Sequence, residues 1–414
     1  MTKYDVVIAG AGPAGLAAAC RAAQAGARTV MVDDNPRPGG QIWRASSSKW
    51  IRRAESHDIE LIAGARIFDA PGERRLAIET LDGAVEIEYR SLVLATGARE
   101  RFLPFPGWTL PNVMGAGGLQ ALVKSGLPMH GKRVVVAGAG PLLLAVAHYL
   151  RSQGAKVLAI AEQTSRAAVG RFALGLFAKP SKLLQAAQLC GVPYRTSTWP
   201  IRAEGHGQLE SVTLSSRGRM VTLACDFLAC GFGLVPNVEL ALLLGCRLSD
   251  TGVAVEDDQR TSVPGVYAAG EITGIGGLDL SLVEGEIAGY SAAGQAERAR
   301  RLHRKRKAER RFAAALERAF TLRPELRQLP HDDTLICRCE DVAYARVRQF
   351  SGWREAKLQT RCGMGPCQGR VCGSAVEFLL GWKSESVRPP LFPARIGSLN
   401  PGAVDRTPHG SPST

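Results

Sequence analysis

The stretch Gly10-Ala11-Gly12-Pro13-Ala14-Gly15 constrains the fold more than any other feature of the chain. An apolar run typical of a buried parallel strand, Tyr4–Ala9, precedes it, and a run of helical character that reaches about Gly26 follows it. A second apolar run, Arg28–Val32, ends at Asp33. This order of strand, glycine turn, helix, strand and acid predicts a dinucleotide-binding βαβ unit.

Each part of this motif has a chemical reason. Gly10 permits a tight turn, Gly12 lets the backbone approach a pyrophosphate, and Gly15 allows the helix to pack closely on the strand. The free N–H groups at the helix N-terminus then face the phosphates. Asp33 follows Gly15 by 18 residues, the place of a carboxylate that accepts ribose hydroxyls. A tight turn without a ligand is the alternative interpretation.

A second motif of this kind begins with the apolar run Lys132–Ala137, continues as Gly138-Ala139-Gly140-Pro141-Leu142-Leu143, and ends at Glu162. Leu143 stands where the third glycine is expected, and such overpacking typically costs about 1–3 kcal/mol unless the backbone moves. We therefore expect a second domain that no longer uses NAD(P)H and is either empty or holds another adenine nucleotide. Its candidate contacts are Gly138, Gly140 and Glu162. The alternative is a working NAD(P)H site that tolerates the larger residue.

The ten cysteines fall into two groups. Those before residue 300 lie among apolar residues and are interpreted as small core residues, so no redox dithiol is expected: Cys20, Cys190, Cys225, Cys230 and Cys246. The others form a C-x-C pair followed by the glycine-rich RCGMGPCQGRVC, a pattern that suits the four thiolates of a 2Fe–2S cluster. The predicted ligands are Cys337, Cys339, Cys362 and Cys367, with Cys372 in reserve for the fourth position. Zinc and buried, unligated thiols are the alternatives.

The formal net charge of +14 is concentrated in part in residues 298–311, RARRLHRKRKAERR. A basic run can bind nucleic acid, but no aromatic residues interleave with these charges. We interpret the run as a solvated helix face or a contact for an acidic protein, and we predict no nucleic-acid binding. Asp5 interrupts the N-terminal apolar run, which favours a strand over a signal peptide. A cytoplasmic location follows as an expectation, with peripheral membrane association left open and no transmembrane segment.

Three further segments resemble those of a known protein family. NPRPGGQIWR from Asn35, LVLATG from Leu92 and VYAAGE from Val266 are together similar to segments of the thioredoxin-reductase and pyridine-nucleotide-disulfide flavoproteins. The resemblance implies FAD in the first βαβ unit, with Glu271 at a position where Asp is usual. The candidate flavin contacts are Gly10, Gly12, Pro13, Ala14, Gly15, Asp33, Asp34, Gly40, Gln41, Ala95, Thr96, Gly97, Gly270 and Glu271.

Across nearly the whole chain, VMVDDNPRPGGQIW, LVLATGARERFLPFPGW, GAGPLLLAVA, CGFGLVPNVELA and the C-terminal cysteine segments resemble the α subunits of heteromeric flavin dehydrogenases. These are the opine oxidase, D-hydroxyproline and proline dehydrogenase, and hydrogen cyanide synthase type. The resemblance implies a D-amino-acid-oxidase-like β subunit that oxidises a C–N bond, sometimes a ferredoxin-like γ subunit, and an outside electron acceptor. The resemblance also leaves open an FMN bound at a subunit interface. The cysteine segment resembles the bacterioferritin-associated-ferredoxin-like domain, with C-x4-C replacing its usual C-x2-C.

We thus expect an α/β fold with two nested Rossmann-like, thioredoxin-reductase-like domains and a small helical iron–sulfur domain. The expected divisions are an FAD domain at 1–105 and 250–295, an inserted NAD(P)-type domain at 106–249, a basic helical connector at 296–330, a 2Fe–2S domain at 331–385, and an irregular tail at 386–414. The expected function is electron transfer in a dehydrogenase of CH–NH or CH–NH2 donors with a non-NAD acceptor. A self-sufficient NAD(P)H-dependent reductase and a zinc-bearing, nucleic-acid-binding scaffold are the alternatives. No catalytic residue is identified.

Overall fold

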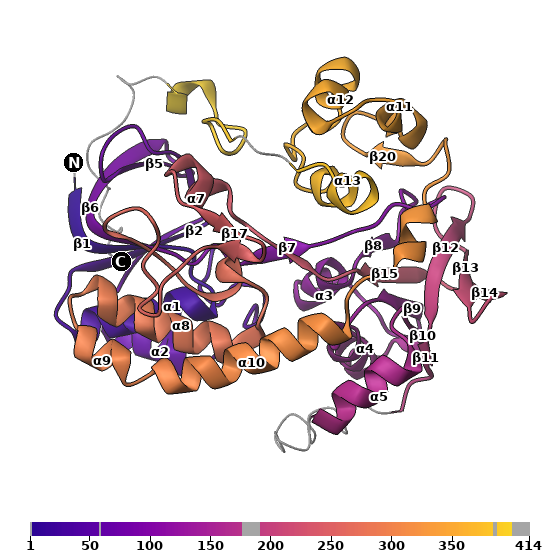
Figure 1. Cartoon of the computed structure of the whole chain (residues 1–414), viewed down its shortest axis with the longest axis horizontal. Helices are drawn as coiled ribbons and strands as arrows, with labels where there is room; N and C mark the ends of the chain where they lie inside the picture. The colour runs from indigo at the N-terminus through magenta and orange to yellow at the C-terminus, as the bar shows by residue number, and fades with distance from the viewer. Residues whose placement is uncertain (1, 58, 176–190, 384–386, 400–414) are drawn as a thin grey trace. The chain divides into compact units, whose positions relative to one another are not determined.

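The computed structural model describes residues 2–57, 59–175, 191–383 and 387–399, so the expectation for Cys190 lies outside the described residues. The chain forms two compact units (Figure 1). Unit 1 comprises the described parts of 1–99, 236–314 and 386–414, and unit 2 those of 100–235 and 315–385. Within the described ranges, no helix has the length and apolar character needed to cross a bilayer.

Unit 1 is built on a seven-stranded sheet of mostly parallel strands. Its order is β3 (Glu60–Ala63), β2 (Thr29–Asp33), β1 (Thr2–Ala9), β6 (Ala84–Leu94), β5 (Arg75–Glu79) and β4 (Arg66–Asp69), with β19 (Val266–Ala268) also paired to β6. Only the β4–β5 and β5–β6 pairs of this sheet are antiparallel. Every residue of β2 is buried, as expected for a parallel strand covered on both faces.

Two helices lie side by side on one face of this sheet, α1 (Pro13–Gln24) and α8 (Gly277–Ala292) (Figure 1). Glycines make the close approach possible, since a Cβ on Gly285 or Gly289 would lie 2.2 Å from the carbonyl oxygen of Ala14 or Ala18. Further helices of unit 1 are α2 (Lys49–Ser56), α7 (Glu239–Leu243), η2 (Gly270–Thr273) and α9 (Ala296–Arg300), and two short strands are β17 (Leu248–Ser249) and β18 (Gly252–Val253).

The basic run falls on α9 and on α10 (His303–Ala319), and part of it has a structural role. Glu284 on α8 is fully buried, and its carboxylate pairs with Arg306 at 3.3 Å and with Arg310 at 2.8 Å. Removing one partner of a buried pair leaves an uncompensated charge, which is strongly destabilising. These two arginines therefore hold α10 to α8 and are not free to meet a polyanion.

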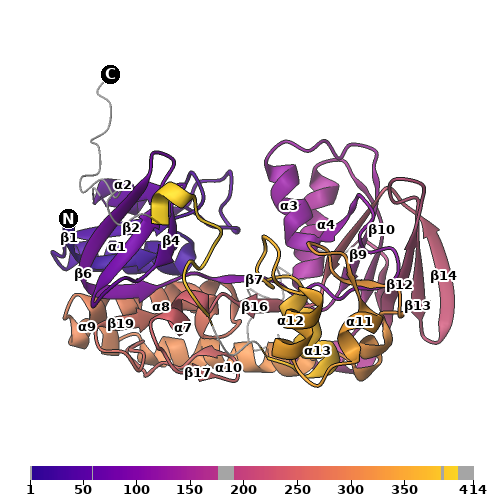
Figure 2. The same ribbon diagram turned by 90° about the horizontal axis from the view of Figure 1, so that it is seen from above.

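Unit 2 contains a parallel sheet in the order β11 (Tyr194–Thr196), β10 (Lys156–Glu162), β9 (Arg133–Gly138), β15 (Phe227–Gly231) and β8 (Val113–Gly115). Helices α3 (Ala116–Lys124), α4 (Leu142–Ser152) and α5 (Arg166–Gly175) accompany it. A three-stranded antiparallel sheet, β12 (Thr198–Glu204), β13 (Ser211–Ser216) and β14 (Arg219–Ala224), lies beside β9 and β10 (Figure 2). Strands β7 (Ala98–Glu100) and β16 (Leu234–Pro236) pair separately.

The cysteine-rich segment also belongs to unit 2 and has its own small core. Its elements are η3 (Pro324–Gln328), β20 (Leu335–Cys337), β21 (Val342–Ala343), α11 (Tyr344–Arg348), α12 (Trp353–Thr360) and α13 (Cys372–Leu380). The described tail, 387–399, is irregular apart from η4 (Ile396–Leu399). It lies against unit 1 through Leu391 on Phe68 and Arg395 on Glu79.

Candidate functional site

The turn between β1 and α1 requires glycine at the two ends of its motif. Gly10 has a φ of +107°, and a Cβ there would lie 2.4 Å from the carbonyl oxygen of Ala95. A Cβ on Gly15 would lie 1.8 Å from the carbonyl oxygen of Gly10. The Asp33 carboxylate accepts a hydrogen bond from the Ala11 N–H at 2.5 Å and so fixes the turn to the end of β2.

The Asn35–Arg44 segment closes over this turn. Gly40, with a φ of +57°, approaches so closely that a Cβ there would lie 3.0 Å from the Cα of Gly12. The Arg44 guanidinium donates to Asn35 at 2.7 Å, while its buried Nε has no partner among the described residues. No side chain caps Gly12, so the first N–H groups of α1 are available to an anion. Glycine turn, uncapped helix and unpaired buried donor fit the pyrophosphate and flavin of a dinucleotide.

The Ala95-Thr96-Gly97 turn after β6 is held by a residue that the sequence did not indicate. The side-chain amide of Asn237 donates to the backbone carbonyl of Thr96 at 2.9 Å. The backbone carbonyl of Asn237 accepts a hydrogen bond from the Thr96 hydroxyl at 2.7 Å. Arg99 donates to the Asn237 side chain at 2.8 Å. Asn237 follows Thr96 by 141 positions, and no local pattern signals such a contact.

The Gly270–Thr273 turn after β19 is organised by Glu284. This carboxylate accepts from the Gly270 N–H at 3.1 Å and from the Thr273 hydroxyl at 2.9 Å. Glu271 lies in the same turn, and burial raises the pKa of its carboxyl while a hydrogen bond from the Gly277 N–H opposes the rise. Gly270 is also tight, since a Cβ there would lie 2.7 Å from Ala14 on α1. The structure therefore brings the predicted residues 270 and 14 together.

The corresponding turn in unit 2 is also formed, and a carboxylate at the end of a strand holds it, as Asp33 does in unit 1. A Cβ on Gly138 would lie 1.9 Å from the carbonyl oxygen of Gly231. Glu162 is completely buried and accepts from the N–H groups of Gly140 and Thr164, each at 2.8 Å. Burial raises the pKa of this carboxyl, although these hydrogen bonds oppose the rise. Leu143 is likewise fully buried, so its side chain is accommodated in the core of unit 2.

Two features occupy the surroundings of this second turn. A Cβ on Gly140 would lie 3.9 Å from the ring of Phe320, and the buried Gln163 side chain accepts from the Arg323 N–H at 3.1 Å. The segment 320–323 therefore lies over the end of β10. On the other side, the Glu100 carboxylate accepts from Gly117 at 2.6 Å and from Gly118 at 3.0 Å, so it occupies the N-terminus of α3.

The five C-terminal cysteines come from the end of β20 and the turn after it, and from the loop before α13 and the first residue of that helix. The sulfurs of Cys337, Cys362 and Cys372 all lie within 4.8 Å of one another and are buried. Cys339 and Cys367 contact each other, and the Cys367 N–H donates to the Cys339 sulfur. The reserve ligand Cys372 thus belongs to the same group of sulfurs as Cys337 and Cys362, and no His, Asp or Glu among the described residues joins the group.

The electrostatics of this group favour a single thiolate, at Cys337, since hydrogen bonding to Cys337 raises the pKa of Cys362 to about 12 and also raises that of Cys372. The pKa of Cys337 is lowered to about 2 because the thiols of Cys362 and Cys372 donate to its sulfur, as do the N–H groups of Gly363 and Glu340. Backbone N–H groups directed at ligand sulfurs orient those ligands and tune a metal centre. The donor set is therefore suited to iron in a sulfide cluster or to zinc.

Cys225 and Cys230 have the C-x4-C spacing of a redox dithiol, so the expectation that no such pair occurs before residue 300 is wrong as to spacing. Both are free and fully buried, and the residues between them enter the extended strand β15. Burial raises the pKa of Cys225 to about 12 and that of Cys230 higher still. A buried, protonated thiol is a poor nucleophile, so the pair has the character of core residues.

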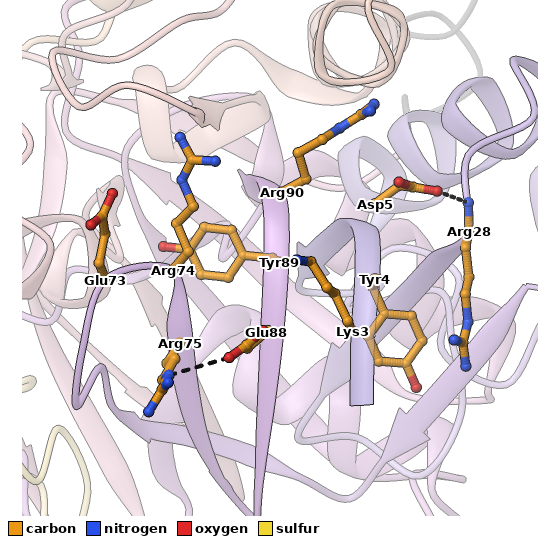
Figure 3. Close-up of a pocket in the computed structure, with 10 residues that line it drawn as sticks. All are labelled: Lys3, Tyr4, Asp5, Arg28, Glu73, Arg74, Arg75, Glu88, Tyr89 and Arg90. Atoms are coloured by element: carbon orange, nitrogen blue, oxygen red, sulfur yellow. Dashed lines mark hydrogen bonds and ion pairs between the residues drawn. The ribbon is translucent and has the colours of Figure 1, made fainter. Parts of the chain in front are cut away.

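A polar cavity lies on unit 1 away from the glycine turn (Figure 3). Its lining is Lys3, Tyr4, Asp5, Arg28, Glu73, Arg74, Arg75, Glu88, Tyr89 and Arg90. Arg75 pairs with Glu88 at 3.4 Å across β5 and β6. Lys3 lies near the start of β1, whereas the Gly10–Gly15 turn follows the end of that strand. The cavity is therefore separate from the dinucleotide cradle.

Comparison with known proteins agrees with the two glycine turns and the sheet order. The family model described as pyridine nucleotide-disulphide oxidoreductase matches residues 4–301. The chain belongs to this family. It is an oxidoreductase and a flavoprotein with the thioredoxin-reductase-like α/β fold, as the sequence predicted.

Full-length relatives also exist. The chain is 32% identical to hydrogen cyanide synthase subunit HcnB of Pseudomonas aeruginosa over 95% of both chains. It is 32% identical to one of the subunits of the opine oxidase of Rhizobium meliloti, over 96% of this chain and 87% of that one. Among solved structures, L-proline dehydrogenase from P. horikoshii matches with a TM-score of 0.69 at 19% identity, covering 96% of this chain and 80% of that one. This last likeness concerns the fold alone.

Proposed function

We propose that the chain is the FAD- and 2Fe–2S-containing electron-transfer subunit of a multi-subunit dehydrogenase that oxidises a C–N bond of an amino acid, imino acid or opine. The observation that carries the proposal is the presence of two redox-type sites in one chain, a dinucleotide cradle in unit 1 and a group of five cysteines in unit 2. Relatives named as subunits of an opine oxidase and of hydrogen cyanide synthase support the heteromeric part.

FAD, when bound, takes up two electrons and releases them singly, which lets it connect a two-electron oxidation to a one-electron carrier. In this chain the turn at Gly10–Gly15 and the N-terminus of α1 would hold its pyrophosphate, and Asp33 keeps that turn in place through Ala11. Gly40 and the Asn237-supported turn at Thr96 would line the rest of the cradle.

The cluster would be held by four of the five cysteines, with Cys337 and Cys339 from the C-x-C pair. Cys362, Cys367 and Cys372 then compete for two positions. We expect serine at two of these three positions to abolish the cluster and serine at the third to leave it intact. Iron and acid-labile sulfide per chain, with the visible spectrum, identify the spare thiol. Equal retention in all three variants would contradict a cluster held here.

NAD(P)H is not the electron donor in this proposal. Phe320 lies beside the Gly140 turn, and the Glu162 carboxylate is completely buried and already accepts hydrogen bonds from Gly140 and Thr164. We expect anaerobic NADH or NADPH to leave the flavin absorbance unchanged over minutes. The control is dithionite, which must bleach the same sample. Bleaching by a nicotinamide within the mixing time would refute this part of the proposal.

The self-sufficient NAD(P)H reductase is the second candidate. Rhodocoxin reductase of Rhodococcus erythropolis favours it, at 32% identity over 64% of each chain. The occupied surroundings of the second turn argue against it. The zinc-bearing scaffold is separated from both by metal and sulfide analysis. An adenine nucleotide in unit 2 would bind beside Phe320, and an FMN would lie at an interface with another subunit.

The substrate pocket would then lie in a partner chain, a D-amino-acid-oxidase-like β subunit, and a ferredoxin-like γ subunit would be a further member. We expect the isolated chain to show no turnover with proline, hydroxyproline or an opine and a dye acceptor. Co-expression with its β subunit should give dye reduction with one of these substrates. Turnover by this chain alone, purified to homogeneity, would place the substrate site here and refute the proposal.

A further inference from the structure

The loop that carries the last cysteines is closed by two glycines. The Cα of Gly369 lies 3.5 Å from where a Cβ of Gly363 would be, and the Trp353 ring lies 2.7 Å from that same point. Residues 364–368 consequently form a short loop tip, whose two ends meet at Gly363 and Gly369 against the Trp353 ring. Met364 and Pro366 are exposed at this tip.

The tip rests directly on the first cysteine pair. A Cβ on Gly365 would lie 2.4 Å from the Cβ of Cys339, and the Cys367 N–H donates to the Cys339 sulfur. Cys339 is exposed, in contrast to Cys337, Cys362 and Cys372. The cysteine group therefore reaches the surface beside the loop tip, at Cys339.

The surface at this point is apolar. Met364 is 44% exposed and Val371, just after the glycine closure, is 41% exposed. We call Met364, Pro366 and Val371 the loop-tip patch. Single exposed apolar residues are ordinary, but Met364 and Pro366 flank Gly365, which lies against the exposed Cys339, and Val371 follows within eight positions of Met364.

A cation stands beside the patch. Arg338 lies between the two cysteines of the C-x-C pair, is exposed, and has no carboxylate partner among the residues that the structure describes. Arg361, by contrast, is paired with Glu340 at 2.7 Å. An unpaired surface arginine next to an apolar patch fits a partner that brings a carboxylate to the same place.

We infer that the loop-tip patch and Arg338 dock an acidic one-electron carrier protein, which exchanges electrons with the cluster through Cys339. The inference rests on the proposed function, since it requires a cluster at these cysteines. In the transfer, one iron of the reduced cluster passes from ferrous to ferric and the carrier gains one electron. No bond forms or breaks and no proton moves. A small contact of this kind suits a transient redox encounter, which typically buries less than about 1,200 Å².

The test uses the full chain with its FAD and cluster, reduced by dithionite and mixed with acidic plastocyanin in a stopped-flow instrument. We expect the double variant Met364→Ser/Val371→Ser to react about ten-fold more slowly than the unaltered chain. Arg338→Gln should also slow the reaction and flatten its dependence on salt. The matched control, Met220→Ser/Leu248→Ser, removes two apolar side chains that are 80% and 42% exposed elsewhere, and it should react at the unaltered rate.

Two further readouts separate the possible failures. Ferricyanide, a small oxidant that needs no docking contact, should oxidise the loop-tip double variant at the unaltered rate. Electron paramagnetic resonance of the reduced samples reports the cluster itself. Equal plastocyanin rates in the loop-tip and control variants, with the cluster signal present, would overturn the docking inference alone. Absence of any cluster signal in the unaltered chain would overturn the proposed function beneath it.

Discussion

The Cys337→Ser variant is expected to lose the iron–sulfur chromophore. Cys337 contacts both Cys362 and Cys372 and receives N–H donors from Gly363 and Glu340, so the proposed cluster uses its sulfur whichever of the last three cysteines completes the set. Loss of a group that only hydrogen-bonds to a ligand already costs about 10–100-fold in metal affinity, and loss of a ligand should cost more. Iron and acid-labile sulfide per chain should fall at least about ten-fold, while bound FAD stays at the level of the unaltered chain.

Cys246→Ser is the control for this variant. Cys246 is a buried core thiol of unit 1 whose sulfur contacts the Thr261 hydroxyl at 3.6 Å, a contact that serine can keep. This control should retain both chromophores. If Cys337→Ser retained full iron and sulfide, the cluster would not be held by this group of cysteines.

Replacing Gly15 by alanine is expected to remove FAD from the chain. The new Cβ would lie 1.8 Å from the Gly10 carbonyl oxygen, so α1 must move away from the strand that it covers. Overpacking of this kind costs about 1–3 kcal/mol of unfolding free energy, and here it also displaces the N–H groups meant for the pyrophosphate. The dissociation constant for FAD should rise by about ten-fold or more, a loss of about 1.4 kcal/mol or more in binding, and the flavin-to-protein absorbance ratio of the purified chain should fall.

Gly72→Ala provides the matched control in the same unit. Its φ is not positive, and its Cβ would make only an ordinary contact, 3.6 Å from Arg75. This variant should keep its FAD and its melting temperature. A Gly15→Ala chain that retained stoichiometric FAD and the unaltered melting temperature would show that the helix does not need this close approach.

The parts of the fold that sequence could predict are those with local signals. Glycine turns, apolar runs and terminal acids predicted β1–α1–β2 in unit 1 and β9–α4–β10 in unit 2, and the structure contains both. Leu143 stands out in the sequence as unusual, but sequence could not show that its side chain would be buried in the core of unit 2. Packing of this kind depends on which residues surround a position in space.

The supporting residues of the candidate site were missed for the same reason. Asn237 meets Thr96, Glu284 meets Gly270, and Phe320 meets Gly140 only because the chain folds back over long separations. Neither composition nor spacing marks an asparagine or a phenylalanine for such a role. The cysteines show the opposite case, because their clustering in sequence predicted their clustering in space, although it left the fourth ligand open.

A reductive titration of the purified chain tests the central claim most directly. Anaerobic addition of dithionite should consume about three electrons per chain, two by FAD and one by a 2Fe–2S cluster. The reduced protein should show a cluster signal in electron paramagnetic resonance. Uptake of two electrons with full flavin bleaching, and no cluster signal, would contradict the claim that this chain carries electrons from a flavin to an iron–sulfur centre.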